Sequence, residues 1–279
     1  MEKIYLWNDK TIRTQQEYPS ITPMLIDSES PCPAVLIIPG GGYSCVCSAT
    51  EGFPIAEKFN SMGFHTFILD YRTYPDLWPK PQLDAMRAMK IIRANAHLWQ
   101  VDPRRIAVCG FSAGAHLAGS LGTICDRLDA SNGDAADQFP YLPNAMILCY
   151  GVLAFTEWSH IGSQKMLAGE KFEEMRHDLS LIEHVNDNTP PTFLMHTIRD
   201  QVVSYRNSLE FADAMAKFNR PCELNLFYWG DHGMLLGKDT LDVTQWPENA
   251  CNFLKSLERD GSDPNFKQRY THAYQAERC

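Results

Sequence analysis

The sequence predicts an α/β fold in which a mostly parallel central sheet is flanked by helices. Two observations support this prediction: short aliphatic segments alternate with longer helix-forming segments, and most of the aliphatic segments are continuous rather than alternating in polarity. Continuous aliphatic strands are typical of parallel sheets that are covered on both faces. A chain of 279 residues, of which 44% are hydrophobic, is long enough to bury such a sheet, and we expect one domain over residues 1–279.

The first half of the chain supplies one edge and the centre of the predicted sheet. Residues 34–38 are short, continuous and aliphatic, as a central parallel strand is. Pro54 suits the first turn of a helix, and Leu83, Met86 and Met89 recur at helical spacing in a later one. The expected strands of this half cover 3–7, 21–26, 34–38, 65–69 and 106–109, and the expected helices cover 54–62 and 82–99.

The second half continues the same alternation. A small-residue helix follows Gly114, Pro221 ends an amphipathic helix, and the tail from Glu258 is polar and expected to be loosely held. The expected strands of this half cover 145–150, 192–196 and 223–228, and the expected helices cover 205–218 and 248–257.

Residues 155–188 differ from the rest because they mix bulky apolar side chains with many charges and show no strand alternation. We interpret them as short helices that form a cap insertion over the carboxyl edge of the sheet, where such folds bind ligands. Plain surface decoration is the alternative. The apolar side chains of this segment are also compatible with a homodimer contact.

A serine stands at a predicted turn between a strand and a helix. The apolar run 106–109 is followed at once by Gly110-Phe111-Ser112-Ala113-Gly114. The two glycines remove side chains that would collide in such a sharp turn. Ser112 Oγ would then stand exposed above the sheet, and the N–H of Ala113 would point at an oxyanion formed beside it.

Three successive glycines follow the predicted central strand, in Pro39-Gly40-Gly41-Gly42-Tyr43. Glycines at the end of a buried strand let the backbone approach a ligand and turn its N–H groups inward. A phosphate-binding loop is the competing interpretation, but neither GxxxxGK[ST] nor GxGxxG is present. Because a serine turn lies further along the chain, we expect an oxyanion hole formed by the N–H groups of Gly41, Gly42 and Ala113.

An acid and a base follow two later predicted strands. A serine hydroxyl is a weak nucleophile at neutral pH and needs a base within reach that an acid orients. Asp200 follows the strand 192–196 and His232 follows the strand 223–228, so both are expected at the same sheet edge as Ser112. We therefore predict Ser112 as nucleophile, His232 as base and Asp200 as acid, with no metal and no organic cofactor.

Other histidines and acids are weaker candidates. His116 lies one helical turn after Ser112 and is expected to pack beside the turn, and His196 is expected to support the loop of the acid. Asp187 is the nearest rival to Asp200. The remaining alternatives are His65, His160, His177 and His184 for the base and Asp70, Asp84 and Asp231 for the acid.

Charge and cysteine usage restrict the partners and the compartment. The formal net charge of -9, without clustered Lys and Arg, disfavours nucleic acid and anionic membranes, so we expect a neutral small molecule as partner. The nine cysteines include no C-x2-C pair, and Cys45 and Cys47 are too close for a zinc site. Free thiols, the absence of a signal-like N-terminus and the lack of an apolar run near 20 residues together predict a cytoplasmic protein.

Five segments together resemble a known family of enzymes: PGGGY at 39–43, YRTYP at 71–75, VDPRRIAVCGFSAGAHLA at 101–118, RDQVV at 199–203 and DHG at 231–233. In this order they resemble the alpha/beta-hydrolase esterases related to hormone-sensitive lipase, and in particular the acetyl-xylan-esterase-like or carbohydrate-esterase-like bacterial branch. The similarity covers roughly residues 34–257. Pro39 departs from the histidine of the lipase-like members, and Thr197 departs from the glycine of many relatives.

The resemblance implies the alpha/beta-hydrolase fold and the cleavage of short-chain carboxylic esters, including acetyl esters of sugars or xylo-oligosaccharides, through an acyl-enzyme. An arylformamidase or a peptidase-type hydrolase is an alternative because the same triad cleaves other acyl bonds. A catalytically silent binding module of this fold is the alternative from another class. The aromatic residues that could line a substrate pocket, or belong to the core, are Tyr43, Trp78, Trp158 and Trp229.

Overall fold

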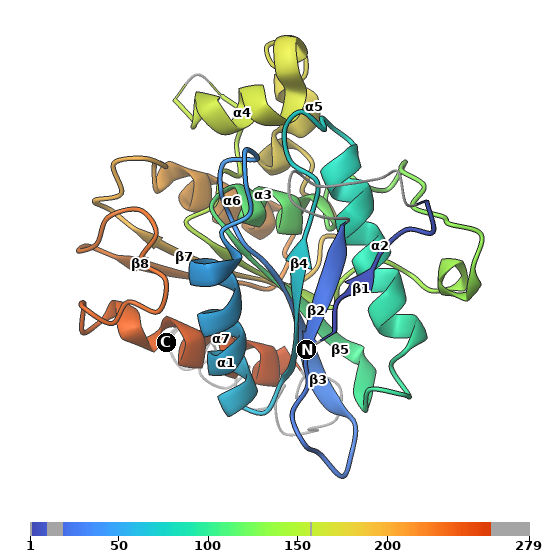
Figure 1. The fold of residues 1–279 in the computed structure, drawn as a ribbon. Helices are drawn as coiled ribbons and strands as arrows, with labels where there is room; N and C mark the ends of the chain where they lie inside the picture. Colours follow the sequence, from blue (N-terminus) through green and yellow to red (C-terminus); the bar gives the residue numbers. More distant parts are fainter. Residues whose placement is uncertain (1, 10–18, 157, 258–279) are drawn as a thin grey trace, which may run out of the picture.

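The computed structural model describes residues 2–9, 19–156 and 158–257, and an eight-stranded sheet crosses the part of the chain that it describes (Figure 1). The strands are β1 (Ile4–Tyr5), β2 (Ser20–Met24), β3 (Cys32–Ile38), β4 (His65–Asp70), β5 (Val101–Phe111), β6 (Ala145–Cys149), β7 (Thr192–Thr197) and β8 (Cys222–Phe227). Their order across the sheet is β1-β2-β4-β3-β5-β6-β7-β8. The pairings of β2 with β1 and with β4 are antiparallel, and every other pairing is parallel.

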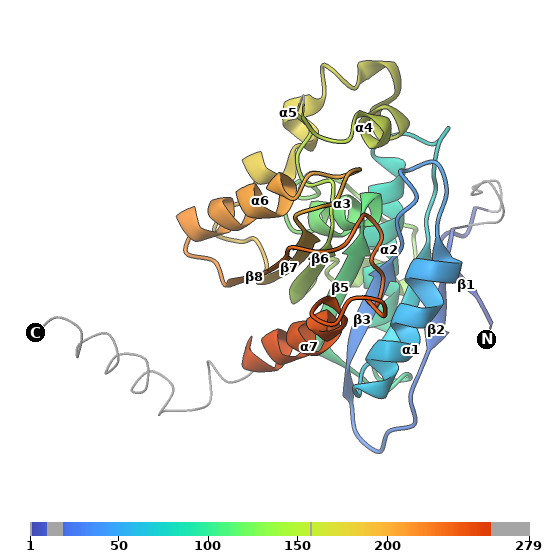
Figure 2. The same cartoon turned by 90° about the vertical axis from the view of Figure 1, so that its left-hand side faces the viewer.

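Helices cover both faces of this sheet (Figure 2). They are α1 (Phe53–Ser61), α2 (Lys80–Ala94), α3 (Ala113–Ser120), α6 (Arg206–Lys217) and α7 (Trp246–Leu257). α2, α3 and α6 pack on one face, and α1 and α7 pack on the other. In β3, Leu36 and Ile38 belong to the first core and Val35 and Ile37 to the second, which explains why this strand reads as a continuous apolar run.

Residues 155–188 rise beyond the carboxyl ends of the parallel strands as a group of short helices (Figure 1). These are α4 (Ile161–Ala168), α5 (Arg176–Leu179) and two 3₁₀ turns, Gly169–Lys171 and Leu181–Glu183. Phe155, Leu167, Leu179 and Leu181 are fully buried and join the core on the α3 side of the sheet. The group is therefore packed onto the sheet domain through its own apolar side chains.

Most of the predicted strands and helices agree with the structure to within two residues at each end. The predicted helix over 82–99 is wrong at its C-terminal end, because α2 stops at Ala94. The Asn95 side chain and the Asn95 backbone N–H both donate to the Ile91 carbonyl, at 2.9 and 3.1 Å, and the chain leaves the helix at Asn95 with φ −101° and ψ 10°. Leu98, an apolar residue within the predicted range 82–99, lies beyond the end of α2 and is 73% exposed.

The strand before Ser112 is longer than the predicted 106–109. β5 begins at Val101, which pairs with Cys32 across an irregularity in the register with β3. A polar segment at the start of a strand gives no periodic signal, so only the apolar half of β5 was predictable.

Two sequence-based expectations concern properties of the whole chain. No helix within the described ranges is both long enough and apolar enough to cross a bilayer. The cysteines of those same ranges are free thiols, and Cys109, Cys125, Cys149 and Cys251 are buried. The tail from Glu258 lies outside the described residues.

Trp246 connects the last helix to the rest of the core. Its side chain is fully buried, with its ring centroid 6.2 Å from that of Phe59 and 5.9 Å from that of Phe111. Its indole N–H donates to the Leu235 carbonyl at 2.7 Å. One side chain thus links α7 to α1, to the end of β5 and to the loop that follows His232.

We expect Trp246→Ala to lower the free energy of unfolding by about 3–5 kcal/mol, because it leaves a large cavity between α7 and the sheet. Urea unfolding measures this change. Leu241→Ala is the control, since Leu241 is 92% exposed and its truncation is expected to change stability by less than about 0.5 kcal/mol. Equal losses in the two variants would contradict the role of Trp246.

Candidate active site

Ser112 lies at a strained turn between β5 and α3. Its backbone has φ 53° and ψ −120°, a combination that non-glycine residues rarely adopt. The neighbouring strand end holds this conformation, because the Ser112 N–H donates to the Cys149 carbonyl at 3.0 Å and the Val152 N–H donates to the Ser112 carbonyl at 3.3 Å. Glycine is required at position 114, since a Cβ there would lie 2.2 Å from the Ile38 carbonyl oxygen.

The structure brings the predicted nucleophile, base and acid together at this edge of the sheet. His232 Nε2 lies 2.9 Å from Ser112 Oγ, and His232 Nδ1 lies 2.7 Å from Asp200 Oδ2. Because an ionised carboxylate only accepts hydrogen bonds, Nδ1–H is the donor to Asp200 and Nε2 is left to accept the serine proton. Asp200 follows β7 and His232 follows β8, so strand ends position both side chains.

The carboxylate of Asp200 is held in a polar niche. Burial alone raises its pKa, but hydrogen bonds from His196, His232 and the Val203 N–H outweigh that effect and hold the pKa well below its ordinary value. Oδ1 accepts the N–H groups of Val202 at 2.9 Å and Val203 at 2.8 Å. The acid therefore stays ionised beside the base.

His196 holds the loop that carries Asp200. It is fully buried, its Nδ1 lies 2.8 Å from Ser208 Oγ, and its Nε2 lies 2.9 Å from the Val203 carbonyl and 3.3 Å from Asp200 Oδ2. Asp231 supports the loop of the base instead of orienting the imidazole. Its Oδ1 accepts the His232 N–H at 2.8 Å and the Gln201 N–H at 3.3 Å, which ties the two loops together.

The glycine loop after β3 lies against the serine turn. A Cβ on Gly40 would be 2.7 Å from the Phe111 carbonyl and 3.0 Å from Ser112 Cβ. Gly41 has φ 126°, which favours glycine, and its carbonyl accepts the Cys45 N–H at 3.2 Å. Within the described ranges, the N–H groups of Gly41, Gly42 and Ala113 have no hydrogen-bond acceptor. They are thus available to a negatively charged oxygen beside Ser112.

The rival histidines lie in structural positions or at the surface. His116 is fully buried between the Tyr43 hydroxyl and the Leu179 carbonyl, each at 2.8 Å, and burial lowers its pKa to about 4. His65 bonds the Ile26 N–H and the Gln100 carbonyl, both at 3.1 Å. His177 is exposed and contacts Glu183, and His184 is half-buried and contacts the His177 carbonyl.

None of the rival acids contacts the imidazole of His232. From His232, Asp231 accepts a hydrogen bond only at the backbone N–H. Asp84 is fully buried and pairs with the Arg72 guanidinium at 2.7 Å. Asp70 lies at the end of β4, where it pairs with Lys3 at 3.7 Å. Asp187 is exposed in the connection that leads to β7.

His160, in the segment 155–188, lies near enough to His232 and Asp200 for their charges to affect its pKa. It caps the N-terminus of α4, where its Nδ1 accepts the Ser163 N–H at 3.2 Å. Burial, followed by the charge of His232, lowers its pKa. Ser163 Oγ lies 3.8 Å from the position of a Cβ on Gly42, so α4 begins beside the glycine loop.

The aromatic candidates separate into core and surface residues. Tyr43 is 1% exposed and packs edge-on against Tyr71 and His116. Trp78 packs partly buried against the core. Trp158 stacks under the Arg206 guanidinium at 4.6 Å, and Trp229 is 58% exposed with Arg199 at 5.0 Å from its ring centroid.

Sequence reasoning missed three polar side chains at this site: Glu51, Tyr150 and Ser163. Of the three, Glu51 has the clearest signal in the sequence, because it is a carboxylate that soon follows the glycine loop and precedes a predicted helix. Tyr150 and Ser163 carry no local signal that distinguishes them from other tyrosines and serines. No cluster of three or more His, Cys, Asp or Glu side chains among the described residues is arranged to hold a metal ion.

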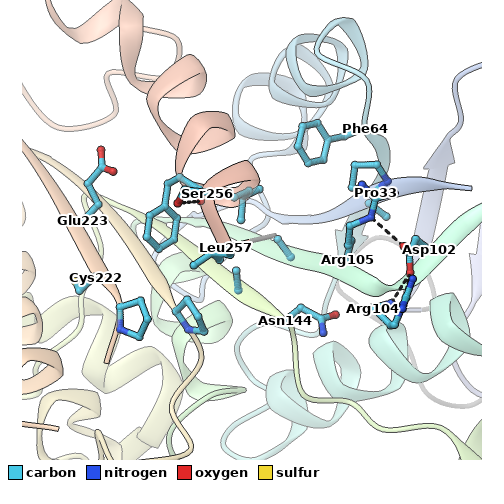
Figure 3. Close-up of a pocket in the computed structure, with 17 residues that line it drawn as sticks. Pro33, Phe64, Asp102, Arg104, Arg105, Asn144, Cys222, Glu223, Ser256 and Leu257 are labelled. Carbon is cyan, nitrogen blue, oxygen red and sulfur yellow. Dashed lines mark hydrogen bonds and ion pairs between the residues drawn. The ribbon is translucent and has the colours of Figure 1, made fainter. Parts of the chain in front are cut away.

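A cavity of about 1070 Å³ lies at the opposite edge of the sheet (Figure 3). It is lined by residues at the amino ends of the parallel strands, including Ala34, Arg105, Ala145 and Cys222, and by Leu257 of α7. Because Ser112 lies at the carboxyl end of β5, this cavity has no part in the site described above.

Comparison with known proteins places the chain in a family. The family model BD-FAE matches residues 24–215. The chain belongs to the BD-FAE family. The motifs that resemble carbohydrate esterases are thereby explained, and the predicted alpha/beta-hydrolase fold is confirmed by the similarity to solved structures.

The similar proteins include one named as a xylanase and one named as an acetylxylan esterase. The chain is 33% identical over 243 residues to endo-1,4-beta-xylanase B of Butyrivibrio fibrisolvens, with 84% of this chain and 38% of that protein covered. It is 27% identical over 231 residues to the acetylxylan esterase of Xylanibacter ruminicola, with 80% and 45% covered. The chain thus spans less than half the length of these two curated relatives.

A solved structure of similar length gives a more complete match. The acetyl ester-xyloside bifunctional hydrolase of Caldicellulosiruptor lactoaceticus is 37% identical, with a TM-score of 0.86 and coverage of 92% of this chain and 96% of that one. The whole described domain therefore has a counterpart in a named acetyl-ester hydrolase.

The depressed pKa of Asp200 predicts a pH-dependent contribution to stability. This contribution is complete above the ordinary carboxyl pKa and is lost as the pH falls from about 5 towards 2, because the unfolded chain binds the proton first. We expect Asp200→Asn to be less stable than the wild type at pH 6, with a difference that shrinks on acidification. Urea unfolding at several pH values measures this trend.

The control is Asp213→Asn, which removes a carboxylate that is 65% exposed in its ion pair with Lys217. It should follow the wild-type pH dependence. A constant difference between Asp200→Asn and the wild type from pH 6 to pH 2.5 would contradict the prediction.

Proposed function

We propose that the chain is a serine hydrolase that cleaves short-chain carboxylic esters through an acyl-enzyme on Ser112. The observation that carries the proposal is the continuous hydrogen-bonded path from Ser112 Oγ through His232 to Asp200, at 2.9 and 2.7 Å. The names of the relatives support the same reaction, since an acetylxylan esterase and an acetyl-ester hydrolase are among them.

The proposed mechanism uses only side chains and peptide groups of this chain. His232 Nε2 accepts the Ser112 proton as Oγ attacks the ester carbonyl, and Asp200 stabilises the imidazolium that results. The N–H groups of Gly41, Gly42 and Ala113 stabilise the tetrahedral oxyanion. His232 then gives its proton to the leaving alcohol, and water repeats the sequence on the acyl-enzyme.

The proposed substrates are acetyl esters, including those of sugars or xylo-oligosaccharides. The names of the curated relatives and of the solved structure support an acetylated carbohydrate. α4 begins beside the glycine loop, with Ser163 Oγ 3.8 Å from the position of a Cβ on Gly42, so residues of the proposed cap would contact a substrate bound there.

The proposed function includes a single-domain organisation and a cytoplasmic location. We propose one hydrolase domain over 1–279 in which 155–188 acts as a cap that limits substrate size. A cytoplasmic location is supported by the free thiols of the described ranges, because disulfides are rare in reducing compartments.

We expect Ser112→Ala to lower kcat for p-nitrophenyl acetate by about 10⁶, because it removes the nucleophile. It should also abolish labelling by a fluorophosphonate probe. Ser120→Ala is the matched control, since Ser120 lies at the far end of α3, where its Oγ donates to the Leu117 carbonyl at 2.7 Å and accepts the Cys125 thiol at 3.7 Å. Turnover by folded Ser112→Ala at a substantial fraction of the wild-type rate would show that another residue is the nucleophile.

An acyl-chain series tests the substrate class. We expect kcat/KM to fall by about tenfold or more from p-nitrophenyl acetate to the octanoate, because a site that fits an acetyl group has no room for a longer acyl chain. Acetylated xylo-oligosaccharides and N-formylkynurenine are compared in the same series. Faster cleavage of N-formylkynurenine than of any ester would favour an arylformamidase, and a wild-type protein without turnover or probe labelling would favour a binding module.

A further inference from the structure

A buried carboxylate lies behind the glycine loop, outside the triad. Glu51 is 7% exposed and belongs to the π-helical turn Ser48–Gly52 that precedes α1. Its Oε2 accepts the Gly40 N–H at 2.7 Å, and its Oε1 accepts the Tyr150 hydroxyl proton at 3.0 Å. Among the described residues, no Lys or Arg forms an ion pair with it. A buried carboxylate without an ion pair lowers the stability of the fold, so its presence here calls for an explanation.

The hydrogen bond to Gly40 fixes the first peptide of the glycine loop. The loop is held at a second point, where the Tyr71 hydroxyl donates to the Pro39 carbonyl at 2.8 Å. These two bonds leave little freedom to the segment that leads into Gly41 and Gly42. Because donors to an oxyanion must be placed before the reaction occurs, the anchoring of this segment matters for rate.

The hydrogen bond to Tyr150 connects the same carboxylate to the base. Tyr150 is 1% exposed and directly follows β6, with φ 38° at its backbone. Its ring lies edge-on to the imidazole of His232, with centroids 5.1 Å apart and an interplanar angle of 72°. The Tyr150 N–H donates to the Met195 carbonyl at 2.7 Å, so the ring is fixed from the sheet.

The charge of Glu51 also acts on His232. Burial raises the pKa of Glu51, while the Gly40 and Tyr150 hydrogen bonds and the charge of His232 oppose that rise. The attraction is mutual, so an ionised Glu51 favours the protonated imidazole. The titratable groups that surround these two residues are Asp200, His160, Tyr71, Tyr150, Cys47 and Cys149.

We propose that Glu51 is a positioning residue of this hydrolase site, one that anchors the glycine loop through Gly40, orients His232 through Tyr150, and stabilises the imidazolium by its charge. The inference rests on the proposed function and adds a second carboxylate to it, on a different element from Asp200. Glu51 does not touch the reacting atoms, so it acts through the groups that do.

Three variants separate anchoring from charge. Glu51→Gln keeps an acceptor for the Gly40 N–H and a partner for the Tyr150 hydroxyl but removes the charge. Glu51→Ala removes both, and Tyr150→Phe removes only the hydroxyl. We expect kcat for p-nitrophenyl acetate to fall by about tenfold in Glu51→Gln and by about 10²–10³ in Glu51→Ala, with KM nearly unchanged, because the loss falls on the transition state.

The pH profile of kcat/KM distinguishes this role from a structural one. In Glu51→Gln the acid limb should shift to lower pH, because the imidazolium has lost a favourable charge; in Tyr150→Phe it should stay in place. Asp102→Asn is the control, since Asp102 also accepts a backbone N–H, that of Arg104 at 2.9 Å, but lies at the far end of β5. It should leave kcat and the acid limb unchanged.

Urea unfolding and the rate of fluorophosphonate labelling are measured for every variant. Wild-type kcat and an unshifted acid limb in folded Glu51→Gln would overturn the inference and leave the proposed function intact. A wild-type protein that neither turns over esters nor reacts with the probe would overturn both. If Glu51→Ala does not fold, Glu51→Gln and Tyr150→Phe carry the test.

Discussion

The site depends on the contact between the first turn of α3 and the end of β3. Gly114 brings the helix so close to the Ile38 carbonyl that any Cβ would collide with it. This approach sets the distance between the serine turn and the glycine loop, two segments that are far apart in the chain. Backbone packing, and not a side-chain contact, therefore places Ser112 beside the glycine loop.

Buried polar groups around this contact form hydrogen bonds that hold the neighbouring loops in one arrangement. Asp200 bonds two backbone N–H groups besides His232, and His116 bridges Tyr43 and the C-terminal residue of α5, Leu179. If a partner moved away, the buried group would lose its hydrogen bond, and the free energy of the fold would rise. The network thus favours a single geometry of the loops, which suits a reaction that tolerates little displacement of its groups.

The sequence allowed the prediction of the sheet, most of the helices and the triad residues, because each of these follows from a local pattern. Ser112 stands in a glycine-flanked turn, and Asp200 and His232 each follow an aliphatic strand, so topology alone brings them to one edge. The end of α2 was not predictable, since the helix ends before Asn95 although apolar residues continue to Leu98. Nor was the contact between Glu51 and Tyr150, because neither residue lies in a local motif that marks it as a partner of the other.

The loop that carries the base is attached to the last helix through the bond between the Trp246 indole and the Leu235 carbonyl. Helices at the end of a chain open locally more often than a central sheet does. An opening of α7 would break this bond and loosen the segment after His232, while Ser112 stayed in place at the end of β5. The placement of His232 is therefore coupled to the docking of α7 on the sheet.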